Sequence, residues 1–453
     1  NGGKQDLREN RILIEPYQFI SYLEVYAFKA IGHHGFIRVK GVIDESLADR
    51  YLMMMQQEVW VSVILQNEDL NRDFFRGIVT NLRIIDENGV HILEFEARSG
   101  SYLLDCCEHI RSFQADGISY RQMIDTCLAP YGNSSATIQA QGGNVIHELV
   151  LQYRESDWKF MKRLAGKQHT VLYPDNCTAG IHINFGLEEV INEKKIESSE
   201  YSVEKDASGC TYVVTCREPY EIGERVVFLQ KRLHVSQVVS ELKGNELYHK
   251  CYLRNKEEMK CMPEKNENLQ GASLQAAVSA VEGDMVQIKI LRDENTEYSG
   301  YRWYTYATVY STPDGTGWYC MPEAGDRVRL LFPDTDEGNA YVVSSVHMEG
   351  GQDRVNPAHK SFMNKQRKEV LFTPDAIILR NNQGLALEMK DEEGIKIISD
   401  KDIIMQAEKS ITINSKNAHI SMEAEDALSM KQGSTALSLN KTIKMSGGRI
   451  NMN

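Results

Sequence analysis

The chain has 453 residues, which at roughly 150 residues per domain leaves room for about three domains. Hydrophobic residues make up 42% and charged residues 25%, proportions that are ordinary for a globular protein and exclude global disorder, collagen and a mucin-like stalk. The 51 basic and 64 acidic residues give a net charge of −13, which disfavours a nucleic-acid-binding protein because such proteins carry a basic face.

Signals for membranes, metals and catalysis are missing from the sequence. No apolar run approaches the roughly 18–20 residues that span a bilayer. The first residues carry no basic-then-apolar leader, so we expect synthesis in the cytoplasm without a signal peptide. None of the nine cysteines has a CxxC spacing, which predicts reduced thiols and no zinc site. Nucleophile elbows, phosphate loops and zinc-protease motifs are likewise absent, so we expect no enzyme, no metal and no cofactor.

Residues 1–118 have the short alternating patterns of antiparallel strands. Apolar residues alternate over residues 59–65, and two further strands are expected at residues 74–85 and 91–97. A hairpin-type turn, Asp-Glu-Asn-Gly, separates the latter two at residues 86–89. The sequence therefore predicts a first β-barrel here.

Residues 119–270 are expected to form a helical insertion and a second β-barrel. Ser119 and Gln122 have the spacing of a capping box, which predicts a helix directly after them. A second helix is expected at residues 156–165, with Ser156 at its N-cap and Gly166 just beyond its C-terminal end. Strand patterns resume at residues 180–253, and the polar residues 255–270 indicate a linker.

Residues 271–348 predict a small OB-type barrel, because five short strands with Gly- and Pro-rich turns fit into fewer than 80 residues. Two of the expected strands are aromatic, at residues 301–306 and 318–320. OB barrels often stack single-stranded nucleic acid on aromatic side chains. Residues 272–376 carry 10 basic and 15 acidic residues, however, so their net charge of −5 favours aromatic packing over nucleic-acid binding.

Residues 376–453 show a short internal repeat. Pairs of apolar residues separated by one position recur mostly every eight or nine residues, with polar residues between them, and this is typical of a β-solenoid. The predicted core pairs are Leu387 with Met389, Ile395 with Ile397, Ile403 with Met405, Ile411 with Ile413, Ile420 with Met422, Leu428 with Met430, Leu437 with Leu439 and Ile443 with Met445, followed by Ile450 with Met452.

One strand per repeat cannot bury its apolar face alone. Three chains that wind around a common axis would enclose these pairs in a dry prism and leave no free strand edge. We therefore expect a needle, an intertwined trimeric β-helix, at residues 376–453, preceded by a linker at residues 349–375. A β-roll or an ordinary meander within a monomer is the alternative.

Four stretches carry a resemblance to a known family: residues 101–114, residues 153–164 (YRESDWKFMKRL), residues 322–328 (PEAGDRV) and residues 387–397. The order of parts and these stretches resemble the VgrG family, the spike proteins of type VI secretion, phage tails and extracellular contractile injection systems. The resemblance implies a mainly β protein with two tube-type β-barrels, small helical insertions, an OB-fold collar and the trimeric needle.

The resemblance also implies a mechanical function. Three copies would present six barrels to a hexameric inner tube protein, contact other baseplate proteins and puncture the target cell envelope. A PAAR-type tip protein and effector cargo are implied as further partners, and a place in the baseplate of a contractile particle is implied as the location. The expected docking surface for the tip protein is Ile450, Asn451, Met452 and Asn453. The sequence does not distinguish a phage tail from a type VI or an extracellular system.

Two other functions remain open from the residues alone. A spike that degrades peptidoglycan would need two carboxylates, and Glu155 and Asp157 are acids close together in the chain. Acids are also favoured at the start of a helix, which is where these two lie. The third possibility is the OB-type nucleic-acid-binding module.

Overall fold

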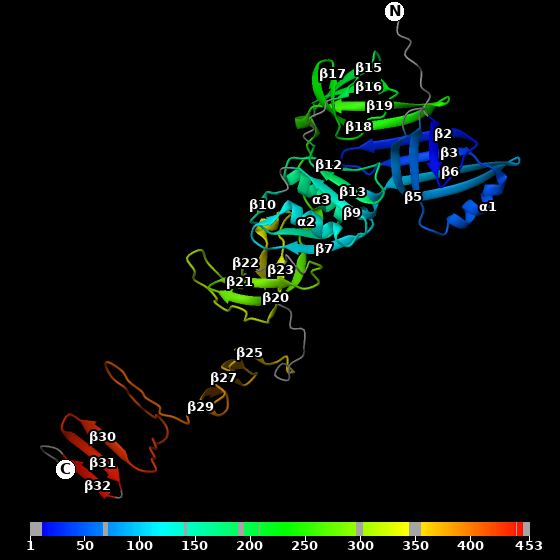
Figure 1. Cartoon of the computed structure of the whole chain (residues 1–453). Coiled ribbons are helices and arrows are strands. Elements are labelled where there is room, and N and C mark those ends of the chain that lie inside the picture. The colour runs from blue at the N-terminus through cyan, green and yellow to red at the C-terminus, as the bar shows by residue number, and fades with distance from the viewer. Residues whose placement is uncertain are drawn as a thin grey trace, which may run out of the picture. The chain divides into compact units, whose positions relative to one another are not determined.

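The computed structural model describes residues 11–66, 71–139, 143–188, 194–207, 209–295, 302–343, 355–440 and 442–446. The chain divides into two compact units, Asn1–Met348 and Glu349–Asn453, which we describe separately (Figure 1). No helix in the described part of the chain is long and apolar enough to cross a membrane.

The first unit begins with a strongly alternating antiparallel sheet. Its first strands are β1 (Arg11–Glu15), β2 (Ser21–Ala30), β3 (Phe36–Val42), β4 (Trp60–Gln66), β5 (Asn71–Glu87) and β6 (Val90–Ser99). Every second residue of β4 is buried, as the alternation at residues 59–65 predicts. The predicted turn between β5 and β6 is present, with Asn88 and Gly89 both at positive φ.

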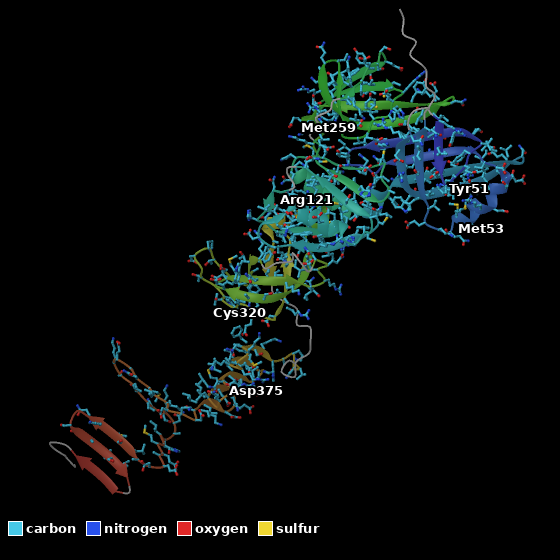
Figure 2. The ribbon with its side chains drawn as sticks, viewed as in Figure 1. Tyr51, Met53, Arg121, Met259, Cys320 and Asp375 are labelled. Carbon is cyan, nitrogen blue, oxygen red and sulfur yellow. The ribbon has the colours of Figure 1, made fainter. Side chains whose placement is uncertain are left out.

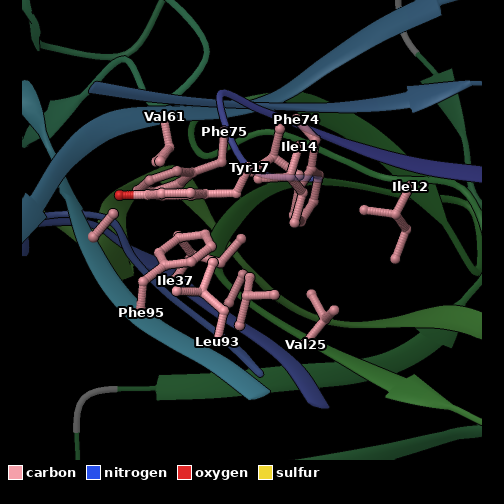
Figure 3. Close-up of a cluster of buried hydrophobic side chains, with 14 of the residues drawn as sticks. Ile12, Ile14, Tyr17, Val25, Ile37, Val61, Phe74, Phe75, Leu93 and Phe95 are labelled. Carbon is pink, nitrogen blue, oxygen red and sulfur yellow. The ribbon is translucent and has the colours of Figure 1, made fainter. Parts of the chain in front are cut away.

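Aromatic side chains fill the core of this sheet. Tyr17, Phe75 and Phe95 are almost fully buried, and Figure 3 shows them converging between the strands. The rings of Tyr17 and Phe95 lie 5.2 Å apart, and Tyr51 meets Tyr17 edge-on at the same distance. Tyr51 belongs to helix α1 (Glu45–Met54), which the sequence analysis missed (Figure 2).

The same sheet continues into the strands that follow the helical part. These strands are β14 (Lys194–Lys195), β15 (Tyr201–Asp206), β16 (Gly209–Cys216), β17 (Arg225–Phe228), β18 (Lys231–Lys243) and β19 (Glu246–Arg254). Strand β18 pairs with β2 over five residues, so one 12-stranded sheet runs through both predicted barrels. The boundaries of the predicted domains stay a prediction.

A helical part with its own apolar core lies between these two sets of strands. Its elements are η1 (Gly100–Asp105), β7 (Glu108–Phe113), β8 (Ile118–Ser119), α2 (Tyr120–Leu128), β9 (Ser134–Ile138), β10 (Val145–Ile146), β11 (Val150–Ser156), α3 (Asp157–Lys167), β12 (Leu172–Pro174) and β13 (Ile181–Phe185). The capping box of Ser119 and Gln122 is formed, and Ser156 caps α3 by accepting from the backbone of Lys159.

Gly166 is a correction to the predicted end of α3. It lies inside the helix rather than just beyond it, and Gln168 is the C-cap. A Cβ at Gly166 would come within 2.6 Å of the backbone oxygen of Met262, so the glycine permits close packing of the 262–263 backbone. The expected linker 255–270 accordingly packs against the sheet and α3, and it contains η3 (Lys256–Met259) and η4 (Glu267–Leu269).

The last part of the first unit, which we call the OB-type sheet, has five strands. They are β20 (Ser273–Glu282), β21 (Met285–Ile290), β22 (Trp303–Thr305), β23 (Arg327–Leu331) and β24 (Tyr341–Val343), with η5 (Glu337–Asn339) before the last. Their order is β22-β21-β20-β23-β24, and a parallel bridge between Tyr306 and Val342 joins the two edges. The strand predicted at residues 318–320 is wrong, since these residues lie in an exposed loop that contains Cys320 (Figure 2).

The second unit contains two antiparallel sheets. The first has β25 (Lys360–Met363), β26 (Glu369–Phe372), β27 (Ala376–Arg380), β28 (Ala386–Lys390) and β29 (Gly394–Ile398), and the second has β30 (Leu428–Gln432), β31 (Thr435–Asn440) and β32 (Thr442–Ser446). Strands β25 and β26 fall inside the expected linker 349–375, so regular structure begins earlier than the sequence predicts.

Candidate assembly surface and buried ionic junction

One face of the sheet β25–β29 carries two apolar columns that run across its strands. The register of the four strand pairs aligns their side chains, because alternate residues of a strand share a face. The first column is Phe372, Ile377, Met389 and Ile395, and the second is Phe362, Val370, Leu379, Leu387 and Ile397. We call these nine residues the apolar columns.

The apolar columns are open to solvent in a single chain. Ile395 is 73% exposed, Ile397 59% and Phe362 54%, and none of the nine side chains is buried. Hollows of about 580 Å³ and 320 Å³ lie along this face, the larger at the Leu387 end and the smaller at the Met389 end. An aligned apolar face of this kind marks an interaction surface.

The opposite face of the same sheet is mixed. Glu388 and Lys396 lie opposite each other there, and Arg380 forms an ion pair with Glu369 at 2.7 Å. Leu371, which is buried, lies opposite Ile378 on this face. Charged side chains therefore interrupt this face, whereas the two apolar columns are continuous.

The first two and the last three of the eight predicted core pairs lie in strands of the second unit. Leu387 and Met389 are opposite Ile397 and Ile395, as equivalent members of successive repeats should be. In the second sheet, Leu428 faces Leu439 and Met430 faces Leu437, which in turn face Ile443 and Met445 of β32. The side chains of Ile443 and Met445 lie outside the described residues, as do the whole of Ile450, Asn451, Met452 and Asn453.

The middle of the repeat forms no regular structure within a single chain. Its three pairs were expected to be buried in strands shared by three chains, and residues 399–427 form no strand within one chain. All six side chains are exposed in the single chain: Ile403 56%, Met405 66%, Ile411 52%, Ile413 55%, Ile420 49% and Met422 52%.

The physical reason for the missing strands is the lack of a partner in the single chain. A strand needs a neighbour for its backbone hydrogen bonds, and a single chain supplies none to these residues. Because these residues form no strands, they form no sheet whose face could bury Ile413 and Met422. A single chain therefore leaves this part of the predicted core exposed. Its burial between three chains stays a prediction.

A second candidate site is buried at the junction of the helical part and the OB-type sheet. We call Arg111, Glu155, Asp157, Arg163 and Glu337 the ionic junction. Asp157, the first residue of α3, is fully buried and accepts hydrogen bonds from Arg111, from Gln152 at 3.0 Å and from the Tyr131 hydroxyl at 3.0 Å. These donors compensate the burial of its charge.

Arg163 lies at the centre of the other half of the ionic junction. It pairs with Glu155 at 2.9 Å and with Glu337 at 2.7 Å, and it donates to the backbone oxygen of Leu151 at 2.8 Å. Burial raises the pKa of Glu155, although the charge of Arg163 acts in the opposite direction. Glu337 belongs to η5, so this guanidinium holds the OB-type sheet to α3.

The loop after β21 adds hydrogen bonds to β7. Asp293 accepts from the backbone of Ser112 at 3.0 Å, Glu294 accepts from the backbone of Ile110 at 2.9 Å, and Asn295 donates to the oxygen of Ser112 at 2.7 Å. Burial favours the neutral form of Glu294, but the hydrogen bonds from Ile110 and His109 outweigh it and lower the pKa of this carboxyl.

These contacts bear on the two alternative functions. Glu155 and Asp157 are both buried and both held by arginines, Glu155 at the wall of a hollow of about 840 Å³ and Asp157 in the core. Tyr304 is buried with its hydroxyl on Gln114, whereas Trp303 and Tyr306 are half-buried. In the described part of the chain, no group of three His, Cys, Asp or Glu side chains is arranged to hold a metal ion.

Two functional features escaped the sequence analysis. The apolar columns extend back to Phe362, Val370 and Phe372, and the short apolar runs at residues 362–363 and 370–372 were the available signal. The roles of Arg163 and Glu337 could not be found, because their contact joins residues 174 positions apart.

The comparisons with known proteins agree with this geometry. A family model described as phage tail baseplate hub (GPD) matches residues 45–178. No curated protein matches the sequence. One similar structure is that of an E. coli protein, described as a component of the type VI secretion system with structural similarity to the T4 bacteriophage tail proteins gp27 and gp5. Its sequence identity to this chain is 11% and the TM-score is 0.52, with 73% of this chain and 99% of that chain covered.

Two structures of a Francisella PdpA–VgrG complex are similar as well. The lidded form gives a TM-score of 0.57 at 9% identity, with 87% of this chain and 80% of that chain covered. The half-lidded form gives 0.56 at 9% identity, with 86% and 88% covered. The fold is therefore similar to that of the type VI secretion component and of the VgrG structures, and residues 45–178 match the model of the phage tail baseplate hub.

Proposed function

We propose that this protein is the structural spike and hub of a contractile injection apparatus, active as a homotrimer whose C-terminal units share one core. The observation that carries the proposal is the exposed pair of apolar columns on β25–β29. Fully burying one large aliphatic side chain contributes roughly 1.5–3 kcal/mol. Three chains that cover one another's columns would gain this contribution many times over.

Residues 399–427 support the same arrangement. Their apolar side chains keep the spacing of the repeat, yet they have no strand partner within the chain. In the proposed trimer, strands of neighbouring chains supply the backbone partners and the apolar pairs face the common axis. The trimeric β-helix would then close on itself and leave no free edge along the needle.

The remaining parts of the proposal rest on the fold. Three first units would present six barrels to a hexameric inner tube protein, and other baseplate proteins would surround them. The needle would puncture the target cell envelope, carrying a PAAR-type tip protein at residues 450–453 and effector cargo. We place its synthesis in the cytoplasm and its working location in the baseplate of a contractile particle. One solved relative is a complex of VgrG with PdpA, which supports assembly with further proteins.

The proposed role is mechanical rather than enzymatic. The candidate acids Glu155 and Asp157 belong to the ionic junction, and the similar proteins are described as hub and secretion components. No observation in the described residues favours a peptidoglycan hydrolase or a nucleic-acid-binding module over the spike.

Limited trypsin digestion of the full chain tests the shared core. Lys401, Lys409 and Lys416 lie in the strandless, exposed segment of a single chain. We expect wild-type protein to resist cleavage at these lysines because the trimer orders the segment. Ile411→Asp should make them cleavable, since burying three unpaired carboxylates near one axis costs several kcal/mol each. Ser415→Asp adds the same charge at an intervening polar position and should stay resistant. Rapid cleavage of the wild type at all three lysines would refute the shared core.

A further inference from the structure

Two cysteine sulfurs meet between neighbouring strands of the 12-stranded sheet. The Sγ atoms of Cys216, at the end of β16, and Cys251, in β19, lie 3.6 Å apart. Val214 is directly opposite Cys251 and Cys216 is opposite His249, so the two cysteines are diagonal neighbours on one face. Diagonal positions of an antiparallel pair are close enough for side-chain contact.

The two thiols differ in their access to solvent. Cys216 is half-buried, with Sγ 3.3 Å from the backbone oxygen of Glu218, whereas Cys251 is fully buried in the core. The contact with Cys216 and burial raise the pKa of the Cys251 thiol. A small reagent can therefore reach Cys216 first, and Cys251 reacts only through it.

We propose that Cys216 and Cys251 are a redox modification site that a small-molecule disulfide, such as oxidised glutathione, converts to an intrachain disulfide. The Cys216 thiolate attacks one sulfur of the reagent, whose S–S bond breaks and releases one thiolate. The Cys251 sulfur, losing its proton, then attacks Cys216 Sγ and displaces the second thiolate. The protein loses two electrons and two protons, and the reagent leaves as two thiols.

The bond requires an adjustment of the two strands as well as of the side chains. A disulfide brings the sulfurs to roughly 2.05 Å and the Cα atoms to within about 7 Å, whereas diagonal positions of an antiparallel pair lie roughly 7–8 Å apart. The two backbones therefore have to approach each other slightly when the bond forms. The bond would link two adjacent strands that already pair at five positions. It would thereby fasten β16 to β19, next to the edge strand β15, without a change of register. This inference does not depend on the proposed function.

The test uses the full chain with the three exposed cysteines Cys106, Cys107 and Cys320 replaced by serine, so that they do not react with the reagent. The protein is incubated with oxidised glutathione, the remaining thiols are alkylated, and the peptides are mapped by mass spectrometry. We expect a peptide pair linked through Cys216 and Cys251, lighter by about 2 Da than the reduced pair. Reduction with dithiothreitol should restore both thiols.

Three variants make the result decisive. Cys216→Ser and Cys251→Ser should each abolish the link, whereas Cys210→Ser, a half-buried cysteine on the same strand β16, should leave it unchanged. Backbone amides of β16 and β19 should exchange hydrogen more slowly in the oxidised wild type. A stable glutathione adduct on Cys216 with Cys251 still alkylatable after unfolding would overturn the proposal, as would a link to a different cysteine.

Discussion

Arg163 of α3 donates from Nη1 to Oε1 of Glu337 in η5 at 2.7 Å, and this contact joins the helical part to the OB-type sheet. The same guanidinium holds Glu155, so one buried cation pairs with two buried carboxylates, and Lys167 also contacts Glu337. Within the stretch YRESDWKFMKRL of residues 153–164, Arg163 therefore binds Glu155 of the helical part and also reaches Glu337 beside the OB-type sheet.

Removing the charge of Arg163 from the ionic junction should strongly destabilise the first unit. Arg163→Met leaves Glu155 and Glu337 buried without their main partner, which costs about 3–5 kcal/mol. Lys167→Met is the control, because Lys167 contacts Glu337 at 3.3 Å from a more exposed position and should cost no more than about 1 kcal/mol. Urea unfolding of both variants measures the difference. Equal stabilities would show that the junction does not hold the unit together.

Gly166 should be intolerant of a side chain. Gly166→Ala places a methyl group 2.6 Å from the backbone oxygen of Met262, and overpacking of this kind costs about 1–3 kcal/mol. Gly132→Ala is the matched control, since a Cβ there meets nothing within 4 Å. Thermal unfolding should separate the two variants by several degrees. A neutral Gly166→Ala would mean that the 262–263 backbone can move away.

The buried His249 should make the first unit sensitive to acid. Burial, with Lys29 and Arg72 nearby, lowers the pKa of His249 from 6.5 to about 3. Between these two values the unfolded chain binds a proton that the folded chain does not, so stability falls as the pH is lowered from 6.5 towards 3. Above pH 6.5 this loss is absent.

The variant His249→Gln tests the acid sensitivity. It removes the titrating ring, so its free energy of unfolding should fall less between pH 7 and pH 4 than that of the wild type. His147→Gln, at an exposed histidine, should keep the wild-type pH profile. Parallel profiles for wild type and His249→Gln would contradict the assignment. Amide exchange in β19 gives the local readout.

The stability of the shared core should depend on Phe362, the first residue of the apolar columns, as well as on the predicted needle pairs. Phe362→Asp puts a charge on a column, whereas Ser361→Asp puts the same charge on the opposite face of β25. We expect Phe362→Asp to lower the thermal midpoint of the assembled second unit and Ser361→Asp to leave it nearly unchanged, because only the first buries an unpaired charge. If both variants behave like the wild type, the shared core begins later than β25.

Local signals allowed several elements to be predicted. Ser119 with Gln122 and Ser156 before α3 gave helix starts because a capping residue acts on backbone groups two or three positions away. The repeat spacing from Leu387 onward gave the residues that align across β28 and β29. Helix α1 was missed although Asp44 at its N-cap, with Ala48 and Tyr51 on one face, carried the signal.

Other features depend on contacts that no local pattern encodes. Trp318 and Tyr319 have the composition of a strand, but Gly315 and Gly317 adopt positive φ and turn the chain into an exposed loop. The pairing of β2 with β18 joins residues about 200 positions apart, and sequence alone gives no register for it. The missing strands of residues 399–427 show the same limit, because their expected partners belong to other chains.

The mass of the full chain in solution tests the central claim most directly. One chain has a mass of 51.5 kDa, so three times 51.5 kDa gives about 155 kDa for the proposed trimer. Native mass spectrometry or light scattering at micromolar concentration should give this value for the wild type and for Ser415→Asp, and a smaller mass for Ile411→Asp. A wild-type protein that stays at 51.5 kDa under these conditions would contradict the shared apolar core.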